Sequence, residues 1–235
     1  MLNIVVCAKQ VIDPETPLSA FRIDPDKKRA IPQPGIPPVI NGFDENAVEA
    51  ALLIKDAVGA TVTVVSVGHD FAIDVMKKPL SMGADRLVLV ESAAVSNLDA
   101  YATAYALSET IKKIGEYDLV LCGIQASDYD NAHVPMGVAE MLQLSCVTNA
   151  RKIDVFNGGL SLQKSIDNGY QVISCPIPAV VTVTSELGEP RYPTLRGIMT
   201  ATRKTPTVWS ASDVGLDSDL LAPRLEITEM FMPVL

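Results

Sequence analysis

Residues 61–67 read Thr61-Val62-Thr63-Val64-Val65-Ser66-Val67, a run in which nearly every side chain is β-branched. Such side chains favour an extended strand, and apolar positions on both sides of the run indicate that both of its faces are buried. Strands buried on both faces are typical of parallel sheets covered by helices. Three other short runs share this character, namely residues 3–8, 86–91 and 118–122.

Amphipathic stretches separate these runs. In the first of them apolar side chains recur near the helical period of about 3.6 residues. Asp70 and Asn97 stand just before the second and third stretches and are predicted N-caps. The alternation of strands and helices predicts an α/β fold with a doubly wound, mostly parallel, Rossmann-like sheet. The predicted helices cover residues 45–58, 71–82, 98–114 and 132–142.

Two regions interrupt this alternation. Residues 9–40 form a long polar insertion that holds many of the prolines, and its middle, residues 21–31, is expected to make a small hairpin. After Cys146 the pattern changes to strands at 151–156, 160–166, 170–175 and 179–183. The first three are separated by Asn157-Gly158-Gly159 and Asn168-Gly169, which are typical of hairpin turns.

From residue 186 the chain carries the prolines and arginines of an exposed arm. We therefore predict an α/β nucleotide-binding domain over residues 1–185, with a β-hairpin extension at about 146–176. Residues 186–235 are predicted to form an exposed C-terminal arm.

Composition excludes several classes of protein. The 235 residues carry a net charge of -9, so the chain lacks the clustered positive charge that nucleic acid binding requires. No apolar run approaches the roughly 20 residues of a membrane helix, and the first residues show no signal-peptide pattern. We expect no direct membrane insertion and a cytoplasmic location, with the mitochondrial matrix as the alternative. The cysteines form no C-x-x-C pair, and Cys7 and Cys122 are interpreted as buried, unreactive thiols.

A candidate ligand site follows the fourth strand. In a doubly wound sheet, ligands bind beyond the carboxyl ends of the strands, where the strand order reverses. The loop there begins at Gly123 and leads to a predicted helix start near Asn131. We expect the backbone N–H groups of residues 132–134 to point outward at the positive end of that helix and to bind a phosphate or diphosphate. The alternative is an ordinary capped helix with a hydrated loop.

Sequence motifs argue against several kinds of enzyme. No G-x-G-x-x-G follows the first strand and no P-loop motif occurs, so a standard dinucleotide dehydrogenase and a P-loop enzyme are both disfavoured. His69 and His133 each lack a neighbouring histidine or cysteine with which to bind a metal. Asp128 and Asp130 are interpreted as turn and cap residues. We predict no catalytic residue and no metal site.

Residues 189–201 carry a family resemblance. They read Glu189-Pro190-Arg191-Tyr192-Pro193-Thr194-Leu195-Arg196-Gly197-Ile198-Met199-Thr200-Ala201, which resembles the N-E-P-R-Y-x-x-L-x-x-I-M-x-A motif of electron-transfer flavoprotein β-subunits, with Gly188 in place of the usual asparagine. Four further islands follow the family's order. They are Val6 to Val11 (V-x-x-K-x-V), Asn41 to Asp44 (N-P-F-[CD], with Gly42 for proline), Met82 to Arg86 (M-G-A-D-R) and Gly123 to Asp128 (G-x-Q-A-x-D).

This resemblance implies an electron carrier subunit rather than an enzyme in its own right. In the family, an α-subunit supplies most of the site for a redox FAD, and the β-subunit of the heterodimer holds an adenine nucleotide, either AMP or a second FAD. The implied nucleotide-binding positions are Cys7, Ala8, Lys9, Asn41, Gly42, Phe43, Asp44, Val67, Gly123, Ile124, Gln125, Ala126, Ser127, Asp128, Tyr129, Asp130, Asn131, Ala132, His133 and Val134.

The arm corresponds to the family's recognition loop, in which a leucine enters an apolar pocket on acyl-CoA-type or other flavin dehydrogenases. Leu195 matches that leucine, and Arg191, Arg196 and Arg203 flank it. Burial of one apolar side chain, with charges to steer the encounter, suits a transient interface. The alternative is that Leu195 lies on the buried face of a short helix. The implied docking residues are Arg191, Tyr192, Leu195, Arg196, Ile198 and Met199.

The choice between AMP and a second FAD stays open. The FAD branch of the family, which splits electron pairs from NADH, tends to read D-G-D-T-A-Q-V-G-P at the loop. Ala132 and Val134 agree with that pattern, whereas Tyr129, Asn131 and His133 do not. Two functions of other classes remain as alternatives. One is a universal-stress-type nucleotide-binding regulatory module without a redox role, and the other is a hydrolase or ligase on the same fold.

Overall fold

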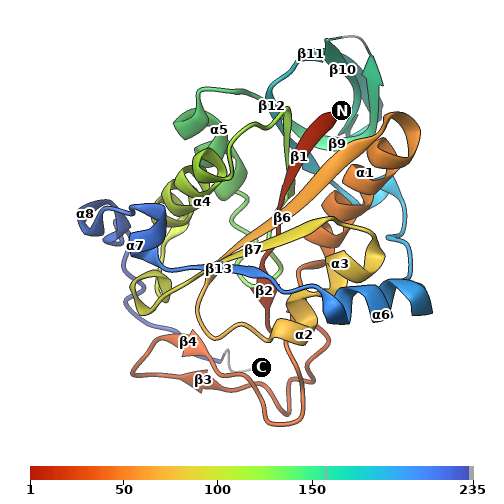
Figure 1. Cartoon of the computed structure of the whole chain (residues 1–235). Helices are drawn as coiled ribbons and strands as arrows, with labels where there is room; N and C mark the ends of the chain where they lie inside the picture. Colours follow the sequence, from red (N-terminus) through yellow and green to blue (C-terminus); the bar gives the residue numbers. More distant parts are fainter. Residues whose placement is uncertain (157, 233–235) are drawn as a thin grey trace.

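A nine-stranded sheet forms the centre of the protein in the computed structural model, which describes residues 1–156 and 158–232 (Figure 1). Its strands follow the order β11-β10-β9-β12-β8-β1-β6-β7-β13. All neighbouring pairs in the order from β9 to β13 are parallel, and β10 pairs antiparallel with β9 on one side and with β11 on the other. The central strands are β1 (Leu2–Cys7), β6 (Ala60–Gly68), β7 (Arg86–Glu91), β8 (Leu119–Gly123) and β12 (Ala179–Val183).

The strand order reverses between β1 and β8. From β1 the chain moves outward through β6 and β7, then crosses back to β8 and continues through β12 on the other side. Leu2 is aligned with Ala60 of β6, and Ile4 is aligned with Leu119 of β8. The predicted α/β class with a doubly wound, mostly parallel sheet is confirmed, and the reversal identifies the edge at which such folds bind ligands.

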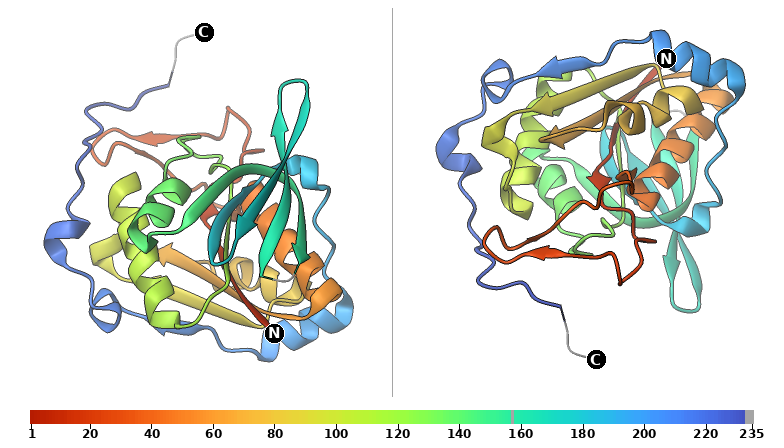
Figure 2. Two further views of the ribbon diagram at one scale, coloured as in Figure 1. Left: turned by 90° about the horizontal axis from the view of Figure 1, so that it is seen from above. Right: turned by 90° about the horizontal axis from the view of Figure 1, so that it is seen from below.

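Helices cover both faces of this sheet, as Figures 1 and 2 show. Because successive side chains of a strand point to opposite faces, Ile4 and Val6 pack under the helices of one face and Val5 under those of the other. The first face carries α1 (Gly42–Val58), α2 (Ile73–Met76), α3 (Lys78–Met82) and α6 (Leu195–Arg203), and the second carries α4 (Ala100–Ile114) and α5 (Val134–Leu142).

Several predicted helix boundaries were wrong. The single helix expected over residues 71–82 is two short helices that meet at Lys77, and Pro79, which lacks an N–H donor, stands in the first turn of the second. Asp70 is not an N-cap but a left-handed residue with φ 57°. The cap of α4 is Asp99 rather than Asn97, because the Asp99 side chain accepts the N–H of Ala102.

The predicted hairpin extension is present as β9 (Ser145–Phe156), β10 (Gly159–Ile166) and β11 (Gly169–Pro176). Its bounds agree with the predicted 146–176, but its first strand, expected at 151–156, already begins at Ser145 because β9 first runs parallel to β12. The predicted turn at Asn157-Gly158-Gly159 includes residue 157, which lies outside the described residues. Within the insertion, the expected small hairpin consists of β3 (Ile23–Asp24) and β4 (Arg29–Ala30), while β2 (Gln10–Val11) pairs with β5 (Val39–Ile40).

The C-terminal arm returns to the sheet. After α6, β13 (Thr207–Trp209) pairs with β7 and so becomes an edge strand. Two short helices, α7 (Ala211–Val214) and α8 (Ser218–Leu221), then pack beside α4. Two 3₁₀ turns complete the fold, η1 (Ala93–Val95) and η2 (Ser185–Leu187).

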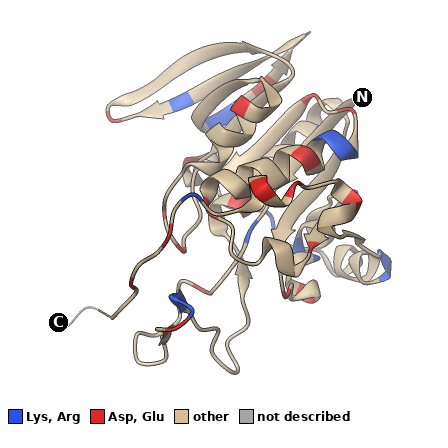
Figure 3. Cartoon of the chain, turned by 90° about the vertical axis from the view of Figure 1, so that its left-hand side faces the viewer, with Lys and Arg blue, Asp and Glu red and all other residues tan. Residues whose placement is uncertain are grey.

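Charged residues of both signs are interspersed on the side of the chain drawn in Figure 3. In the described ranges, no helix combines the length and the apolar character needed to cross a bilayer.

Candidate functional site

The predicted nucleotide-binding residues gather at the carboxyl ends of β1 and β8. Cys7 ends β1 and Gly123 ends β8, and these strands are neighbours at the point where the strand order reverses. Asn41 and Phe43 stand at the start of α1, directly beside both strand ends. Residues far apart in the sequence therefore form one continuous surface, as the topology predicts.

Asp44 joins the two strand ends. Its Oδ2 accepts the backbone N–H of Lys9 at 2.8 Å, and its Oδ1 accepts the backbone N–H of Gly123 at 3.0 Å. The side chain is buried, and burial raises the pKa of the Asp44 carboxyl to about 7. These backbone hydrogen bonds, together with one from the side chain of Asn41 and the charge of Lys9, oppose the rise because they favour the ionised form.

Gly123 is the residue that this close contact requires. A Cβ at position 123 would lie 2.5 Å from Oδ1 of Asp44 and 2.7 Å from the carbonyl carbon of Phe43. Both distances are far shorter than van der Waals contact. Glycine therefore lets the end of β8 approach the first turn of α1.

Asn41 holds the loop that follows β8 close to the ends of β1 and β8. Its Nδ2 donates to the carbonyl of Gln125 at 2.7 Å, and its Oδ1 accepts the N–H of Ser127 at 3.2 Å. The backbone N–H of Asn41 in turn donates to the carbonyl of Lys9 at 2.9 Å. A single buried amide thus sets the path of the loop over the strand ends.

The loop itself is folded tightly and exposes one aromatic ring. Asp130 and Ala132 both have left-handed backbone torsions, with φ of 51° and 55°. Gln125 Nε2 donates to the carboxylate of Asp130 at 2.9 Å. The ring of Tyr129 is half exposed, and its centroid lies 5.7 Å from the ammonium of Lys9. Lys9 also pairs with Asp128, so its charge is largely balanced.

The helix that follows starts later than predicted. We expected a start near Asn131 with free N–H groups at residues 132–134, but α5 begins at Val134 and His133 occupies the N-cap without a side-chain cap. Gly137 makes the first intrahelical bond, to the carbonyl of His133. Because Pro135 has no N–H, the donors at this end belong to Val134 and Met136. Val67 lies near the end of β6 and is half-buried.

The cysteines at the site are buried thiols. Cys7 and Cys122 are both free. A hydrogen bond with Cys7 and burial together raise the pKa of Cys122 well above its ordinary value. This agrees with the prediction of unreactive thiols.

A second feature is the exposed apolar strip of α6, defined as Tyr192, Leu195, Ile198 and Met199. The side chain of Leu195 is 76% exposed and that of Tyr192 is 88% exposed. Leu195 does begin a short helix, capped by Thr194, but it lies on the exposed face, so the alternative of a buried leucine was wrong.

Arg191 differs from the other predicted docking residues because its partly exposed guanidinium is paired with two carboxylates of α1. It contacts both carboxylate oxygens of Glu49 at 2.9–3.1 Å and the carboxylate of Asp56 at 2.9 Å. The hydrogen bond with Glu49 raises the pKa of Arg191 above its ordinary value. Its charge holds the start of the arm against α1, whereas Arg196 is the basic residue next to Leu195 of the apolar strip.

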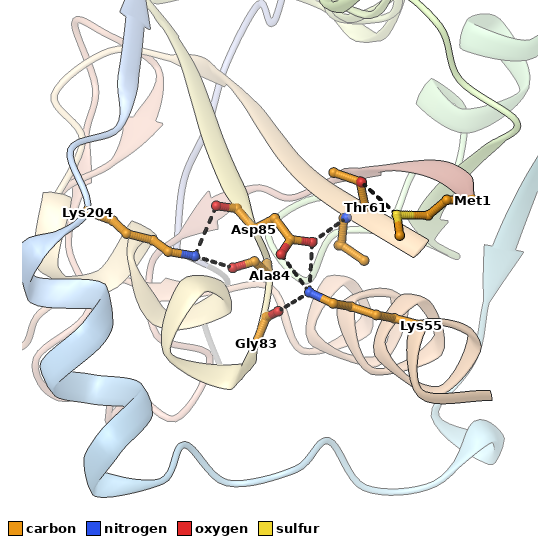
Figure 4. Close-up of polar contacts among 8 residues, drawn as sticks. Met1, Lys55, Thr61, Gly83, Ala84, Asp85 and Lys204 are labelled. Atoms are coloured by element: carbon orange, nitrogen blue, oxygen red, sulfur yellow. Dashed lines mark hydrogen bonds and ion pairs between the residues drawn. The ribbon is translucent and has the colours of Figure 1, made fainter. Parts of the chain in front are cut away.

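Two contacts hold α6 against α3 and β7. A Cβ at Gly197 would lie 2.2 Å from the carbonyl oxygen of Ser81, so only glycine permits this approach. At the other end, the Lys204 ammonium donates to the carbonyls of Ala84 and Asp85, each at 3.0 Å (Figure 4). In the same cluster the Asp85 carboxylate accepts two bonds from Lys55, each at 2.7 Å.

Comparison with known proteins agrees with this arrangement. A family model described as "Electron transfer flavoprotein domain" matches residues 35–214. The chain is 39% identical to the electron transfer flavoprotein subunit beta of Thermoanaerobacterium thermosaccharolyticum, covering 94% of this chain and 83% of the relative. It is 40% identical to the protein of the same name from Clostridium acetobutylicum, covering 92% and 81%. The chain belongs to the electron transfer flavoprotein β-subunit family.

Another relative in this family carries a more specific name. The chain is 36% identical to the caffeyl-CoA reductase-Etf complex subunit CarD of Acetobacterium woodii, covering 98% of this chain and 86% of the relative. The family resemblance inferred from five sequence islands is therefore confirmed over nearly the whole chain.

Sequence reasoning missed two residues that shape this electron transfer flavoprotein subunit. Glu49 is an acid on the buried face of α1, and that position alone signals a hidden basic partner. Lys204 gives no comparable signal, because its partners are backbone carbonyls whose position depends on the folded chain. In the described part of the chain, no group of three or more metal-ligating side chains is found.

Two cavities lie away from the strand ends just described. One, of about 320 Å³, lies between α1 and β9, and the other, of about 440 Å³, lies beside Met1 and Asp118 at the amino ends of the central strands. The topology and the hydrogen bonds of Asp44 and Asn41 favour the opposite edge for a nucleotide, where the loop lies open on the surface.

Proposed function

We propose that this chain is the β-subunit of a heterodimeric electron transfer flavoprotein, which binds an adenine nucleotide at the carboxyl ends of β1 and β8 and docks flavin dehydrogenases through α6. The observation that carries the proposal is the meeting of the Lys9, Asn41–Asp44 and Gly123–Val134 segments where the strand order reverses. An FAD shared with the α-subunit would supply the electron-transfer chemistry.

The chain's own groups fit a nucleotide phosphate. The N–H groups of Val134 and Met136 stand at the positive end of α5, where an anion is stabilised. The hydroxyl of Ser127 is buried, and among the described residues it has no hydrogen-bond partner. An unpartnered buried hydroxyl is unfavourable, and a ligand oxygen would satisfy it.

Tyr129 bears on the choice between AMP and a second FAD. Its half-exposed ring beside Lys9 offers a surface on which a flat ring system can stack. The relative named as a caffeyl-CoA reductase-Etf complex subunit shows that the family includes subunits of larger complexes. If the ligand is a second FAD, the chain is a subunit of an electron-bifurcating complex that uses NADH.

Nucleotide binding is tested by comparing ligands that differ only in phosphate. The heterodimer, stripped of bound nucleotide, is titrated with AMP and with adenosine. We expect AMP to bind at least tenfold more tightly, because only AMP can use the N-terminus of α5. Equal affinities would contradict the phosphate site, and no binding of either ligand would contradict a nucleotide site altogether.

Docking is tested through the apolar strip. Full burial of a leucine side chain contributes about 1.5–3 kcal/mol, which corresponds to a tenfold change in affinity or more. Leu195→Ala is therefore expected to raise KM for the dehydrogenase at least tenfold, with unchanged nucleotide content. Leu18→Ala, which truncates a leucine of similar exposure (70%), is the control and should leave KM as it is. An unchanged KM for the Leu195 variant would contradict docking through α6.

A further inference from the structure

The side chain of Asp44 forms hydrogen bonds at the ends of two neighbouring strands, β1 and β8. The β1–β8 ladder runs from Ile4 and Leu119 to Val6 and Leu121. Beyond that last pair, the N–H groups of Lys9 and Gly123 both point to the Asp44 carboxylate, at 2.8 and 3.0 Å. The carboxylate therefore continues the connection between the two strands after their own ladder has ended.

The surroundings of Asp44 provide little to balance its charge. The cation that faces it is the Lys9 ammonium, which is itself paired with Asp128 in the loop after β8. From β8 the titratable group that interacts with Asp44 is the buried thiol of Cys122, whose pKa the charge of Asp44 helps to raise. Burial is the main reason that the pKa of Asp44 rises to about 7, so the group changes its charge near neutral pH.

The two protonation states differ in what they can hold. An ionised carboxylate accepts hydrogen bonds on both oxygens, and so it can hold the N–H groups of Lys9 and Gly123 together. A protonated carboxyl carries an O–H on one oxygen, and that oxygen becomes a poorer acceptor for the N–H that it faces. Because either oxygen can carry the proton, protonation of Asp44 weakens the connection at both strand ends.

We propose that Asp44 is a positioning residue that couples nucleotide binding to a proton: its ionised side chain holds the ends of β1 and β8 in the binding arrangement, and its neutral form loosens them. This inference rests on the proposed nucleotide site. It goes beyond that proposal because Asp44 acts on the backbone of the site and makes ligand affinity depend on pH.

Binding is measured for the heterodimer by equilibrium dialysis with AMP between pH 6 and 8. If only the ionised form of Asp44 binds, the wild-type affinity falls about tenfold between pH 8 and pH 6, because about a tenth of the groups stay ionised one unit below the pKa. The carboxamide of the Asp44→Asn variant cannot titrate, so this variant should bind AMP weakly at both pH 6 and pH 8. Any pH dependence that remains in the variant comes from the titration of AMP itself, which affects the wild type equally.

Asp118→Asn is the matched control. Asp118 accepts the N–H of Asn3 at 2.7 Å and so joins the same two strands at their opposite ends. The affinity of the Asp118→Asn variant for AMP should depend on pH as that of the wild type does. A wild-type profile that does not differ from that of the Asp44 variant would overturn the proposal, and so would loss of the pH effect in the Asp118 variant.

A second readout does not depend on the ligand. Hydrogen exchange at the amides of Lys9 and Gly123, corrected for intrinsic rates, is followed in the nucleotide-free heterodimer over the same pH range. Protection at both amides should fall as the pH drops through about 7. Constant protection would overturn the proposal even if AMP binds. Conversely, loss of protection without any AMP binding would support the Asp44 connection and contradict the nucleotide site.

Discussion

The buried carboxyl of Asp44 predicts an unusual pH dependence of stability. Its pKa is raised from 3.8 in the unfolded chain to about 7 in the folded protein. Between these values the folded chain binds a proton that the unfolded chain does not, so the free energy of unfolding falls as pH rises from about 4 to about 7. A difference of about 3 pKa units corresponds to a loss of about 4 kcal/mol.

Asp44→Asn removes this titration. An amide has nearly the same shape but stays neutral, so the variant should not lose stability through this site as the pH rises. The free energy of unfolding of the variant minus that of the wild type should therefore increase by up to about 4 kcal/mol between pH 4 and pH 8. A constant offset of about 1–3 kcal/mol against the variant is expected, because its NH₂ group cannot accept the second backbone N–H.

The measurement is urea unfolding of the full nucleotide-free chain, followed by the fluorescence of Trp209, which is the single tryptophan in the sequence. The free energy of unfolding of the wild type is subtracted from that of the variant at each pH, and these differences are compared between pH values. Groups that titrate in the same way in both proteins cancel in this comparison. Parallel stability profiles for the two proteins would refute a raised pKa at Asp44. A difference that moves in favour of the wild type at high pH would refute the sign of the effect.

Three other substitutions follow from close contacts. Gly123→Ala should cost about 1–3 kcal/mol in urea unfolding, because its Cβ overlaps the first turn of α1, whereas Gly42→Ala, with open space around it, should cost little. Gly197→Ala should displace α6 from the carbonyl it touches on α3, and so raise KM for the dehydrogenase while nucleotide content stays the same. Glu49→Gln should destabilise the chain by about 3–5 kcal/mol, since it leaves Arg191 without its buried partner, and an unchanged urea midpoint would contradict this role.

Much of the fold follows from local pattern. The run at 61–67 and its three counterparts become the central strands β6, β1, β7 and β8, because continuous apolar character has a direct physical cause in burial on both faces. The residues at which helices begin were harder to predict. Asp99 rather than Asn97 caps α4, and both residue types suit a cap equally well, so only the three-dimensional path of the chain decides between them.

The sequence predicted which residues meet at the candidate site, but not the hydrogen bonds that hold them together. Gly123 and Asn41 were assigned from family motifs, and the strand order brings them together as expected. That Asp44 would join two backbone N–H groups does not follow from the sequence, because it depends on α1 approaching β8 closely. The edge strand β13 was also missed, since three residues carry too little periodicity to be recognised as a strand.

Nucleotide content is the most direct test of the proposed function. The chain is purified together with its α-subunit, the complex is denatured, and the released nucleotides are separated by chromatography and counted. We predict one FAD shared between the subunits and one further adenine nucleotide per heterodimer. If that further nucleotide is AMP, the protein is a simple electron carrier, and if it is FAD, the protein is a bifurcating subunit. A single FAD with no further nucleotide would contradict the site at the ends of β1 and β8.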